Sequence, residues 1–143
     1  MSRILIINGP NLNMLGLREP DIYGDQTLDD LKELCEKAAK ENAQTIDFRQ
    51  TNHEGEIVSW IQEERDNIDG LIINAAAYTH TSIAIHDALK LINAPIIEVH
   101  ISNPKERESF RHHSYIEPLA SKVIAGMGAQ GYQMALDFLK DNN

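Results

Sequence analysis

The chain has 143 residues, of which 42% are hydrophobic and 24% are charged, and its formal net charge is −9. This length is typical of one domain with a single sizeable core, so we expect residues 1–143 to form one catalytic or binding domain. The acidic charge argues against nucleic acid or an anionic membrane as the main partner, because both bind basic surfaces. An anionic small molecule stays compatible with this composition, provided that local groups bind it.

Short apolar runs alternate with helical patterns along the chain. Five runs are short, rich in Ile and Val and apolar on both faces, as parallel strands covered by helices are. They are residues 3–7, 45–49, 70–73, 96–99 and 122–125. The repeated alternation predicts an α/β fold that is flavodoxin-like, with a five-stranded parallel sheet and helices on both faces.

Four helices are predicted from apolar residues at helical spacing between and after these strands. The first begins after Thr27 and the third after Thr81 or Ser82, because hydroxyl side chains cap helix starts. We expect the second helix to extend to Ile68 and the third to reach Ile92.

The N-terminal apolar run, residues 4–7, is too short for a targeting or membrane segment. A secretory core needs roughly 7–15 apolar residues and a membrane span about 20. Cys35 is the only cysteine, so it forms no internal disulfide, and its place in a helical pattern indicates a buried, unreactive thiol. We therefore expect a cytoplasmic protein that binds no membrane.

Unusually polar segments follow the predicted strands. Ligands of such sheets bind at the carboxyl ends of the strands, so the informative segments are 8–24, 74–81, 100–114 and 126–131. In the first segment, Gly16 and Gly24 bracket a stretch that holds Arg18 and Tyr23. This stretch is either a mobile lid with glycine hinges or an ordinary surface loop.

A G-x-G-x-x-G motif, formed by Gly126, Gly128 and Gly131, joins the last predicted strand to the last helix. A dinucleotide site also needs an acidic residue about 20 positions later within the first βαβ unit, which this late motif lacks. Close packing of helix on strand explains the glycines better, although a non-catalytic nucleotide-binding module remains the alternative function. Asn8 and Asn74 stand where receiver domains carry acidic residues, and the flavodoxin phosphate loop has no counterpart.

Six histidines raise the question of a metal site. However, the chain has no His-x-His, His-x-x-x-His or Cys-x-x-Cys spacing. The adjacent His112 and His113 project in different directions on any regular backbone. We therefore expect no metal.

Glu98 and His100 lie two residues apart at the end of a predicted strand, so their side chains share a face. A histidine oriented by a carboxylate is either a general acid or base or half of a structural ion pair. The catalytic interpretation gains support from polar residues expected at the same sheet edge, which suit hydroxyls and a carboxylate. These are Asn74, Thr79, His80, Ser102, Arg107 and Arg111.

Seven stretches in order resemble the type II 3-dehydroquinate dehydratases, over essentially the whole chain. They are residues 8–13, 18–24, 52–55, 78–82, 97–103, 110–115 and 128–132. The resemblance implies a flavodoxin-like fold and cofactor-free elimination of water from 3-dehydroquinate through an enolate. The chain departs from the family pattern at Ala75 and Ala76, where Pro-Gly or Ala-Gly often follows the asparagine. This departure questions the local loop geometry more than the activity.

The resemblance also assigns catalytic roles. Tyr23 would remove the proton beside the ketone, and Arg18 would stabilise the resulting charge. His100, held by Glu98, would protonate the departing hydroxyl. Asn11 would help to hold a water that donates to the enolate oxygen. Because the matching positions are intact, the resemblance argues against a third interpretation, a degenerate family member that acts as a scaffold.

Substrate-binding roles follow from the same resemblance. Asn74, Ser102 and the backbone amides of Ile101 and Ser102 would bind the substrate carboxylate. The ring hydroxyls would be bound by His80, Asp87 and Arg111, and Arg107 would influence the charge of the lid. The resemblance further implies a homo-oligomer built on trimers, usually a dodecamer, in which Asp87 reaches into a neighbour's site.

Overall fold

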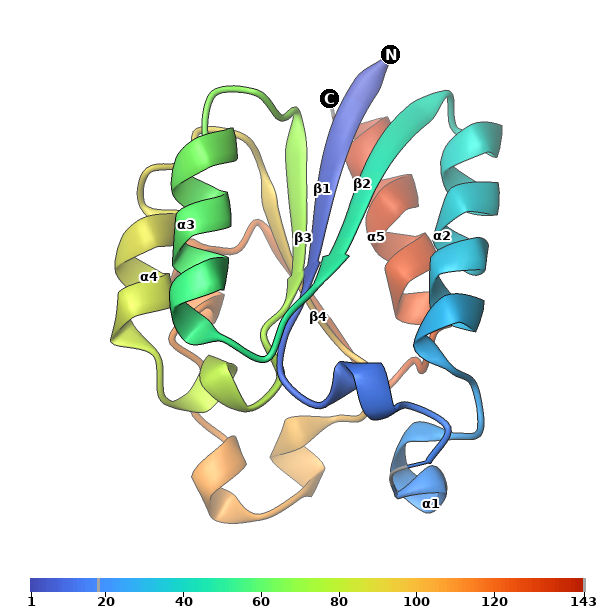
Figure 1. The fold of residues 1–143 in the computed structure, drawn as a ribbon, viewed down its shortest axis with the longest axis vertical. Helices are drawn as coiled ribbons and strands as arrows, with labels where there is room; N and C mark the ends of the chain where they lie inside the picture. The colour runs from blue at the N-terminus through green and yellow to red at the C-terminus, as the bar shows by residue number, and fades with distance from the viewer. Residues whose placement is uncertain (18, 143) are drawn as a thin grey trace.

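Five parallel strands form one sheet in the order β2-β1-β3-β4-β5 in the computed structural model, which describes residues 1–17 and 19–142 (Figure 1). The strands are β1 (Ser2–Asn8), β2 (Gln44–Gln50), β3 (Gly70–Asn74), β4 (Ile96–His100) and β5 (Lys122–Ala125). Each predicted strand falls within an observed one, and the strand order is that of flavodoxin-like folds. The predicted fold class is therefore confirmed, and the order of strands reverses beside β1.

Two helix layers cover the sheet. Helices α2 (Leu28–Glu41) and α5 (Gln130–Asp141) lie on one face, and α3 (Glu54–Glu64) and α4 (Ile83–Leu89) lie on the other (Figure 1). Along β1, Ile4 and Ile6 join the core beneath α2 and α5, whereas Leu5 and Ile7 join the core beneath α3 and α4. Because both faces of β1 are buried, its sequence is a continuous apolar run instead of an alternating one.

Helix starts agree with the predicted caps. The Thr27 hydroxyl accepts a hydrogen bond from the Asp30 amide and the Asp30 carboxylate accepts one from the Thr27 amide, which makes a capping box for α2. Ser82, and not Thr81, caps α4 by accepting from the Ile85 amide at 2.9 Å. Of the two residues considered for this cap, the structure thus selects the second.

Two predicted helix ends are wrong. Helix α3 ends at Glu64 and not near Ile68, because the Asn67 amide donates to the Glu64 carbonyl and closes a turn. Helix α4 ends at Leu89 and not at Ile92. The amides of residues 90, 91 and 92 each donate to the carbonyl three residues earlier, so the chain continues as a tighter turn. Ile68 and Ile92 are nevertheless buried, so the apolar spacing reported burial correctly beyond the helix ends.

Short helices interrupt the loops at the carboxyl edge of the sheet. The segment after β1 contains η1 (Leu12–Met14) and α1 (Pro20–Tyr23), and η2 (Ala76–His80) follows β3. The segment after β4 contains η3 (Pro104–Glu106), η4 (Ser109–Arg111) and η5 (Glu117–Leu119). The segments that follow β1 and β4 extend to the end of the molecule that lies opposite both termini (Figure 1).

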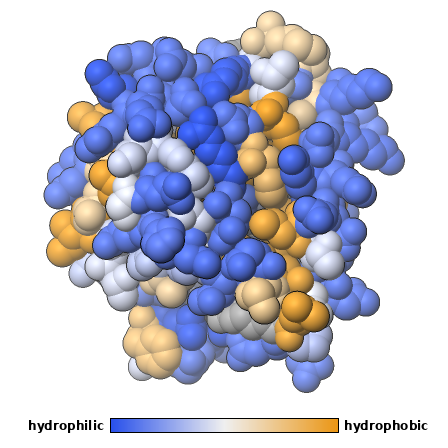
Figure 2. All heavy atoms as spheres, viewed as in Figure 1, coloured by the Kyte–Doolittle hydropathy of each residue, from blue (hydrophilic) through white to orange (hydrophobic). Residues whose placement is uncertain are grey.

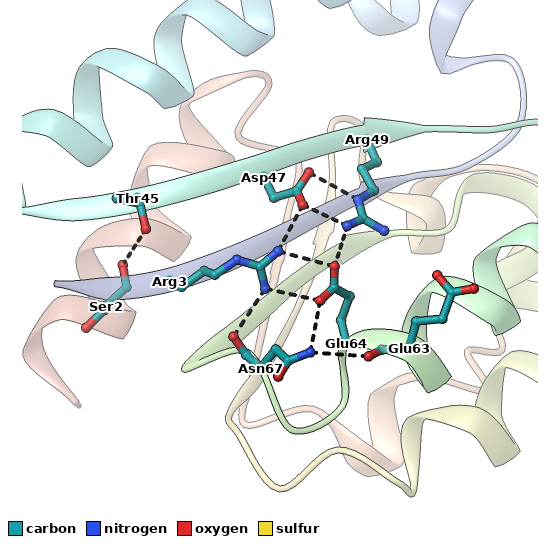
Figure 3. Close-up of polar contacts among 8 residues, drawn as sticks. All are labelled: Ser2, Arg3, Thr45, Asp47, Arg49, Glu63, Glu64 and Asn67. Atoms are coloured by element: carbon teal, nitrogen blue, oxygen red, sulfur yellow. Dashed lines mark hydrogen bonds and ion pairs between the residues drawn. The ribbon is translucent and has the colours of Figure 1, made fainter.

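Four charged side chains join β1, β2 and α3 on the face of the sheet that α3 covers (Figure 3). Arg3 contacts Asp47 at 3.0 Å and Glu64 at 3.2 Å, and Arg49 contacts the same two carboxylates at 2.7 and 2.5 Å. The Arg49 guanidinium also lies 5.4 Å from the centre of the Trp60 ring. Each arginine therefore bridges two acids, and the network ties three elements that are distant in sequence.

The face drawn in Figure 2 is mostly hydrophilic, with hydrophobic residues gathered in a narrow band and a few smaller groups. Among the described residues, no helix has the length and apolar character required to cross a lipid bilayer.

Candidate active site

A cleft of about 470 Å³, here called the main cleft, opens at the carboxyl edge of the sheet. This volume suits a small ring compound. Nine residues predicted from the sequence line it, contributed by the segments after β1, β3 and β4. They are Asn11, Tyr23, Asn74, His80, His100, Ile101, Ser102, Arg107 and Arg111. The structure thus brings together residues that are spread over about 100 positions of the chain.

Tyr23 and Arg107 meet across the main cleft. An Nη atom of Arg107 donates to the Tyr23 hydroxyl at 2.6 Å, and the guanidinium lies 5.3 Å from the ring centre. Tyr23 ends α1, and the glycine after it has a φ of 78°, a left-handed conformation that glycine adopts without strain. A guanidinium that donates to a phenol oxygen stabilises negative charge there, so this pair is suited to proton abstraction.

Glu98 and His100 form the second reactive pair. His100 Nε2 lies 2.5 Å from Glu98 Oε2, and the two residues are only 7% and 1% exposed. Both side chains leave β4 on the same face, as their spacing predicted. His100 lines the main cleft, whereas Glu98 lies behind it and lines a second cleft. The pair therefore presents an imidazole to the main cleft with a buried carboxylate at its back.

His80 supplies a hydrogen-bond acceptor. Its Nδ1 lies 2.8 Å from the His113 carbonyl oxygen, and since a carbonyl only accepts, Nδ1 carries a proton. Burial lowers the pKa of His80, assisted by His100 and Arg111 and opposed by the bond to His113. The neutral ring leaves Nε2 as an acceptor, which suits a ligand hydroxyl.

Asn74 is held from below by a fully buried tyrosine of α5. Its Nδ2 donates to the Tyr132 hydroxyl at 3.0 Å, and that hydroxyl donates to Asn8 Oδ1 at 2.7 Å. Asn74 Oδ1 accepts from the Ala76 amide at 3.1 Å. Burial raises the pKa of Tyr132, which therefore stays protonated as this chain of bonds requires. The Asn74 amide is thus fixed in orientation beside the main cleft.

Residues 2–140 match the family model described as dehydroquinase class II. The chain belongs to the class II dehydroquinase family. It is 57% identical over 135 residues to a 3-dehydroquinate dehydratase of Streptomyces avermitilis, a match that covers 94% of this chain and 85% of that protein. Its structure is similar to a type II dehydroquinase from Propionibacterium acnes, with a TM-score of 0.95, 45% identity and coverage of 99% and 97%. A type II dehydroquinase from Butyrivibrio crossotus gives a TM-score of 0.94 at 48% identity, with coverage of 96% and 97%.

Besides Glu98, which lies behind the main cleft, Asp87 was assigned to the site by the family resemblance but does not line the main cleft of its own chain. Asp87 lies on α4 with its side chain 66% exposed, 3.9 Å from Lys90. It is absent from the residues that line the main cleft. Arg18 lies outside the described residues.

The chain has an unusual backbone conformation at Ala76, where its sequence departs from the family pattern. Ala76 has a φ of 52°, a left-handed conformation that costs a residue with a Cβ about 1–2 kcal/mol. Its amide still donates to Asn74 Oδ1, and it lines the main cleft. An alanine therefore adopts here a backbone conformation that glycine adopts without strain.

The glycine motif after β5 packs a helix onto the sheet. A Cβ on Gly131 would lie 3.3 Å from Ile124 and 3.4 Å from Val99, so the start of α5 approaches β4 and β5 closely. This agrees with the packing role expected for these glycines.

Within residues 1–17 and 19–142, no group of three or more His, Cys, Asp or Glu side chains is arranged to bind a metal ion.

Sequence reasoning missed several residues that shape the site of this dehydroquinase family member. Pro10, Leu12, Ala76, Ala77 and Pro104 also line the main cleft. Ser114 donates to Glu98, and Tyr132 holds Asn74. Ser114 and Tyr132 both lie in stretches that match the family, which was the available signal, but neither had been assigned a role.

Proposed function

We propose that this chain eliminates water from 3-dehydroquinate without a cofactor and forms 3-dehydroshikimate. The observation that carries the proposal is the arrangement of two pairs on one cleft, Tyr23 with Arg107 and His100 with Glu98. Membership of the class II dehydroquinase family and 57% identity to a protein named 3-dehydroquinate dehydratase support it.

The chemistry divides between the two pairs. Tyr23 takes the proton from the carbon beside the ketone, and its positive neighbour Arg107 stabilises the phenolate that does so. The electron pair moves onto the ketone oxygen as an enolate, where a water held by Asn11 donates. When the enolate collapses, the carbon–oxygen bond breaks and His100 supplies the proton with which the hydroxyl leaves as water. Donors placed in advance at the enolate are each worth on the order of 3 kcal/mol.

Substrate binding uses the rest of the main cleft. The backbone amides of Ile101 and Ser102 and the fixed amide of Asn74 bind the substrate carboxylate. His80 accepts from a ring hydroxyl and Arg111 donates to one. Arg18 adds positive charge to the loop that carries Tyr23. These assignments account for an anionic ligand on a chain whose net charge is −9, since the cleft itself is lined by two arginines and two histidines.

An imine mechanism has no suitable residue. Every lysine of the chain, namely Lys32, Lys37, Lys40, Lys90, Lys105, Lys122 and Lys140, is exposed. None lies in an apolar pocket of the kind that makes a lysine an imine-forming nucleophile. Borohydride added with substrate should therefore leave activity and mass unchanged. A mass increase equal to a reduced substrate–lysine adduct would contradict the proposed mechanism.

The assembly is part of the same proposal. We propose that residues 1–143 are one catalytic domain and that copies of it form a trimer-based oligomer, a dodecamer in the usual family arrangement. Ile83 and Phe110, 57% and 66% exposed, are apolar surfaces that such an oligomer would bury. Asp87, which is absent from the cleft of its own chain, would complete the site of a neighbour. The cytoplasmic location stays a prediction.

A direct assay tests the reaction. Incubation with 3-dehydroquinate should produce the ultraviolet absorbance of the conjugated enone product. Tyr23→Phe should bind substrate yet lower turnover by several orders of magnitude, while Tyr115→Phe, which does not line the main cleft, should be unaffected. If Tyr23→Phe kept more than about a tenth of wild-type turnover, the loss would be under roughly 1.4 kcal/mol and Tyr23 would not be the base.

A further inference from the structure

Ser114 makes three hydrogen bonds whose donors and acceptors are determined by chemistry. Its Oγ lies 3.1 Å from the Ile116 amide and 3.1 Å from the Glu117 amide, and 2.8 Å from Glu98 Oε2. Backbone amides only donate, so both lone pairs of the hydroxyl are occupied. A hydroxyl has one proton, and the only partner left for it is Glu98. Ser114 therefore donates to the carboxylate behind His100.

This donation determines the state of the reactive pair. Glu98 Oε2 receives the Ser114 proton and also faces His100 Nε2 at 2.5 Å. An oxygen that accepts from two directions is stabilised as a carboxylate, so His100 Nε2 is the donor in this contact. The nitrogen left for the main cleft is then Nδ1. The hydroxyl thus acts on the imidazole through the carboxylate.

Ser114 and His100 are the two hydrogen-bond partners recorded for the Glu98 carboxylate among the described residues. Its second oxygen, Oε1, is buried without a hydrogen-bond partner among the described residues. An ionised carboxylate at 1% exposure is costly unless it is paired, so the loss of one of two donors matters more here than at the surface. Ser114 reaches Glu98 from the segment that precedes η5, on the side of the second cleft.

We infer that Ser114 is a positioning residue of the dehydratase. It keeps Glu98 as a carboxylate that accepts from His100 Nε2, and so stabilises the imidazolium whose Nδ1–H supplies the proton at the main cleft. The inference rests on the proposed function, in which His100 is the proton donor. Ser114 does not line the main cleft, so its effect falls on turnover and not on substrate binding. A role limited to capping η5 would instead depend only on acceptance from the Ile116 and Glu117 amides.

Three substitutions separate these roles. Ser114→Ala removes both donation and capping, Ser114→Thr keeps both, and Ser114→Asp keeps an acceptor for the amides but places a negative charge beside Glu98. We expect kcat to fall on the order of 10- to 100-fold in Ser114→Ala and at least as far in Ser114→Asp, with KM within about twofold. Ser114→Thr should recover most of the turnover, and Ser109→Ala, an exposed serine of η4, should match the wild type.

Imidazole nitrogen NMR of the folded enzyme gives a readout that capping does not move. In the wild type, His100 Nε2 should carry the proton that bonds Glu98, and in Ser114→Ala and Ser114→Asp the protonation of the two His100 ring nitrogens should change. Full turnover in Ser114→Asp, or unchanged protonation of the His100 ring nitrogens in a folded Ser114→Ala, would overturn the inference. His100→Ala is the separate control, because an active His100→Ala would disprove the proposed acid, whatever the Ser114 variants do.

Discussion

Arg107 donates to the hydroxyl of Tyr23 at 2.6 Å, although the two residues are 84 positions apart and belong to segments that follow different strands. The same guanidinium lies 3.4 Å from Ser102 Oγ and is only 15% exposed. One nitrogen of Arg107, Nη1, therefore contacts two hydroxyl groups of residues that line the main cleft.

Arg107→Ala should lower kcat by on the order of 100-fold or more, because the phenolate loses its charged donor. Arg107→Lys should recover little, since an ammonium on a flexible stem does not hold the position from which Nη1 contacts both hydroxyl groups. Steady-state kinetics measure both, with Arg65→Ala, an exposed arginine beside Asp66, as the control. Wild-type turnover in Arg107→Lys would show that only charge is required there.

Tyr132→Phe should weaken substrate binding from within the core. The change leaves Asn8 Oδ1 and Asn74 Nδ2 without the hydroxyl between them, at a cost of about 1–3 kcal/mol in the free energy of unfolding. We expect KM to rise more than kcat falls, because Asn74 is proposed to bind the substrate carboxylate. Urea denaturation and kinetics test this together, with Tyr115→Phe as the matched control. An unchanged KM at reduced stability would separate Tyr132 from substrate binding.

Ala76→Gly should stabilise the protein. Removing the Cβ relieves a left-handed backbone strain of about 1–2 kcal/mol, offset in part by the greater freedom of glycine in the unfolded chain, roughly 0.5–1 kcal/mol. Ala43, with a φ of 56° after α2, offers a matched position far from the main cleft. Thermal unfolding should show a gain for both variants, and kinetics should show any change for Ala76→Gly alone. A loss of stability in both would mean that the strain is smaller than the entropic term.

The ion network that joins β1, β2 and α3 should make the free energy of unfolding depend on pH. Hydrogen bonds from Arg49, with the charge of Arg3, hold the pKa of Asp47 below its usual value of 3.8. Burial raises the pKa of Glu64, but bonds from Arg3 and Arg49 outweigh it and the pKa lies below 4.5. Groups with lowered pKa values stabilise the fold above those usual values, and the contribution disappears as the pH falls through the folded ones.

The double variant Asp47→Asn, Glu64→Gln should therefore lose stability at neutral pH and show a shallower decline below about pH 4.5. The effect should be under about 1 kcal/mol for each ion pair and should shrink in high salt, because the side chains are partly exposed. Urea denaturation from pH 3 to 7 measures it. Glu63→Gln, an exposed neighbour, is the control, and an identical pH slope in the double variant would exclude the network as its source.

Mixing two inactive variants tests whether sites are shared between subunits. In Tyr23→Phe plus Asp87→Ala hybrids, a working site needs the intact Tyr23 of one chain and the intact Asp87 of the next. Random reassembly at equal amounts should restore roughly a quarter of the sites under the cyclic symmetry of a trimer. Activity no higher than that of the separate variants, despite proven chain exchange, would mean that each subunit is self-contained.

The sequence predicted the sheet well because its strands are buried on both faces and read as continuous apolar runs. The ends of α3 and α4 were wrong because a turn beginning at Arg65 or Lys90 keeps the apolar side chains buried while ending the helix. Apolar spacing reports burial, and it cannot distinguish a last helical turn from the tighter turn that replaces it.

The sequence predicted residues that line the main cleft, in loops as well as at strand ends, but it did not predict the residues that hold them in place. Glu98 and His100 follow from the period of two along a strand. Ser114 contacts Glu98 only because the long segment after β4 folds back upon itself, and Tyr132 reaches Asn74 from another element. Such partners depend on the three-dimensional course of the chain, for which residue spacing carries no signal.

Tyr132 bonds Asn8 across 124 residues and Asn74 across 58. A ribosome synthesises β1, β2 and β3 well before it reaches α5. Until α5 emerges, the side-chain amides of Asn8 and Asn74 lack the Tyr132 hydroxyl that joins them, and Asn74 is not yet fixed beside the main cleft. The edge that binds the ligand is therefore completed by a helix made late in translation, so a nascent chain with its central strands already paired still lacks an ordered site.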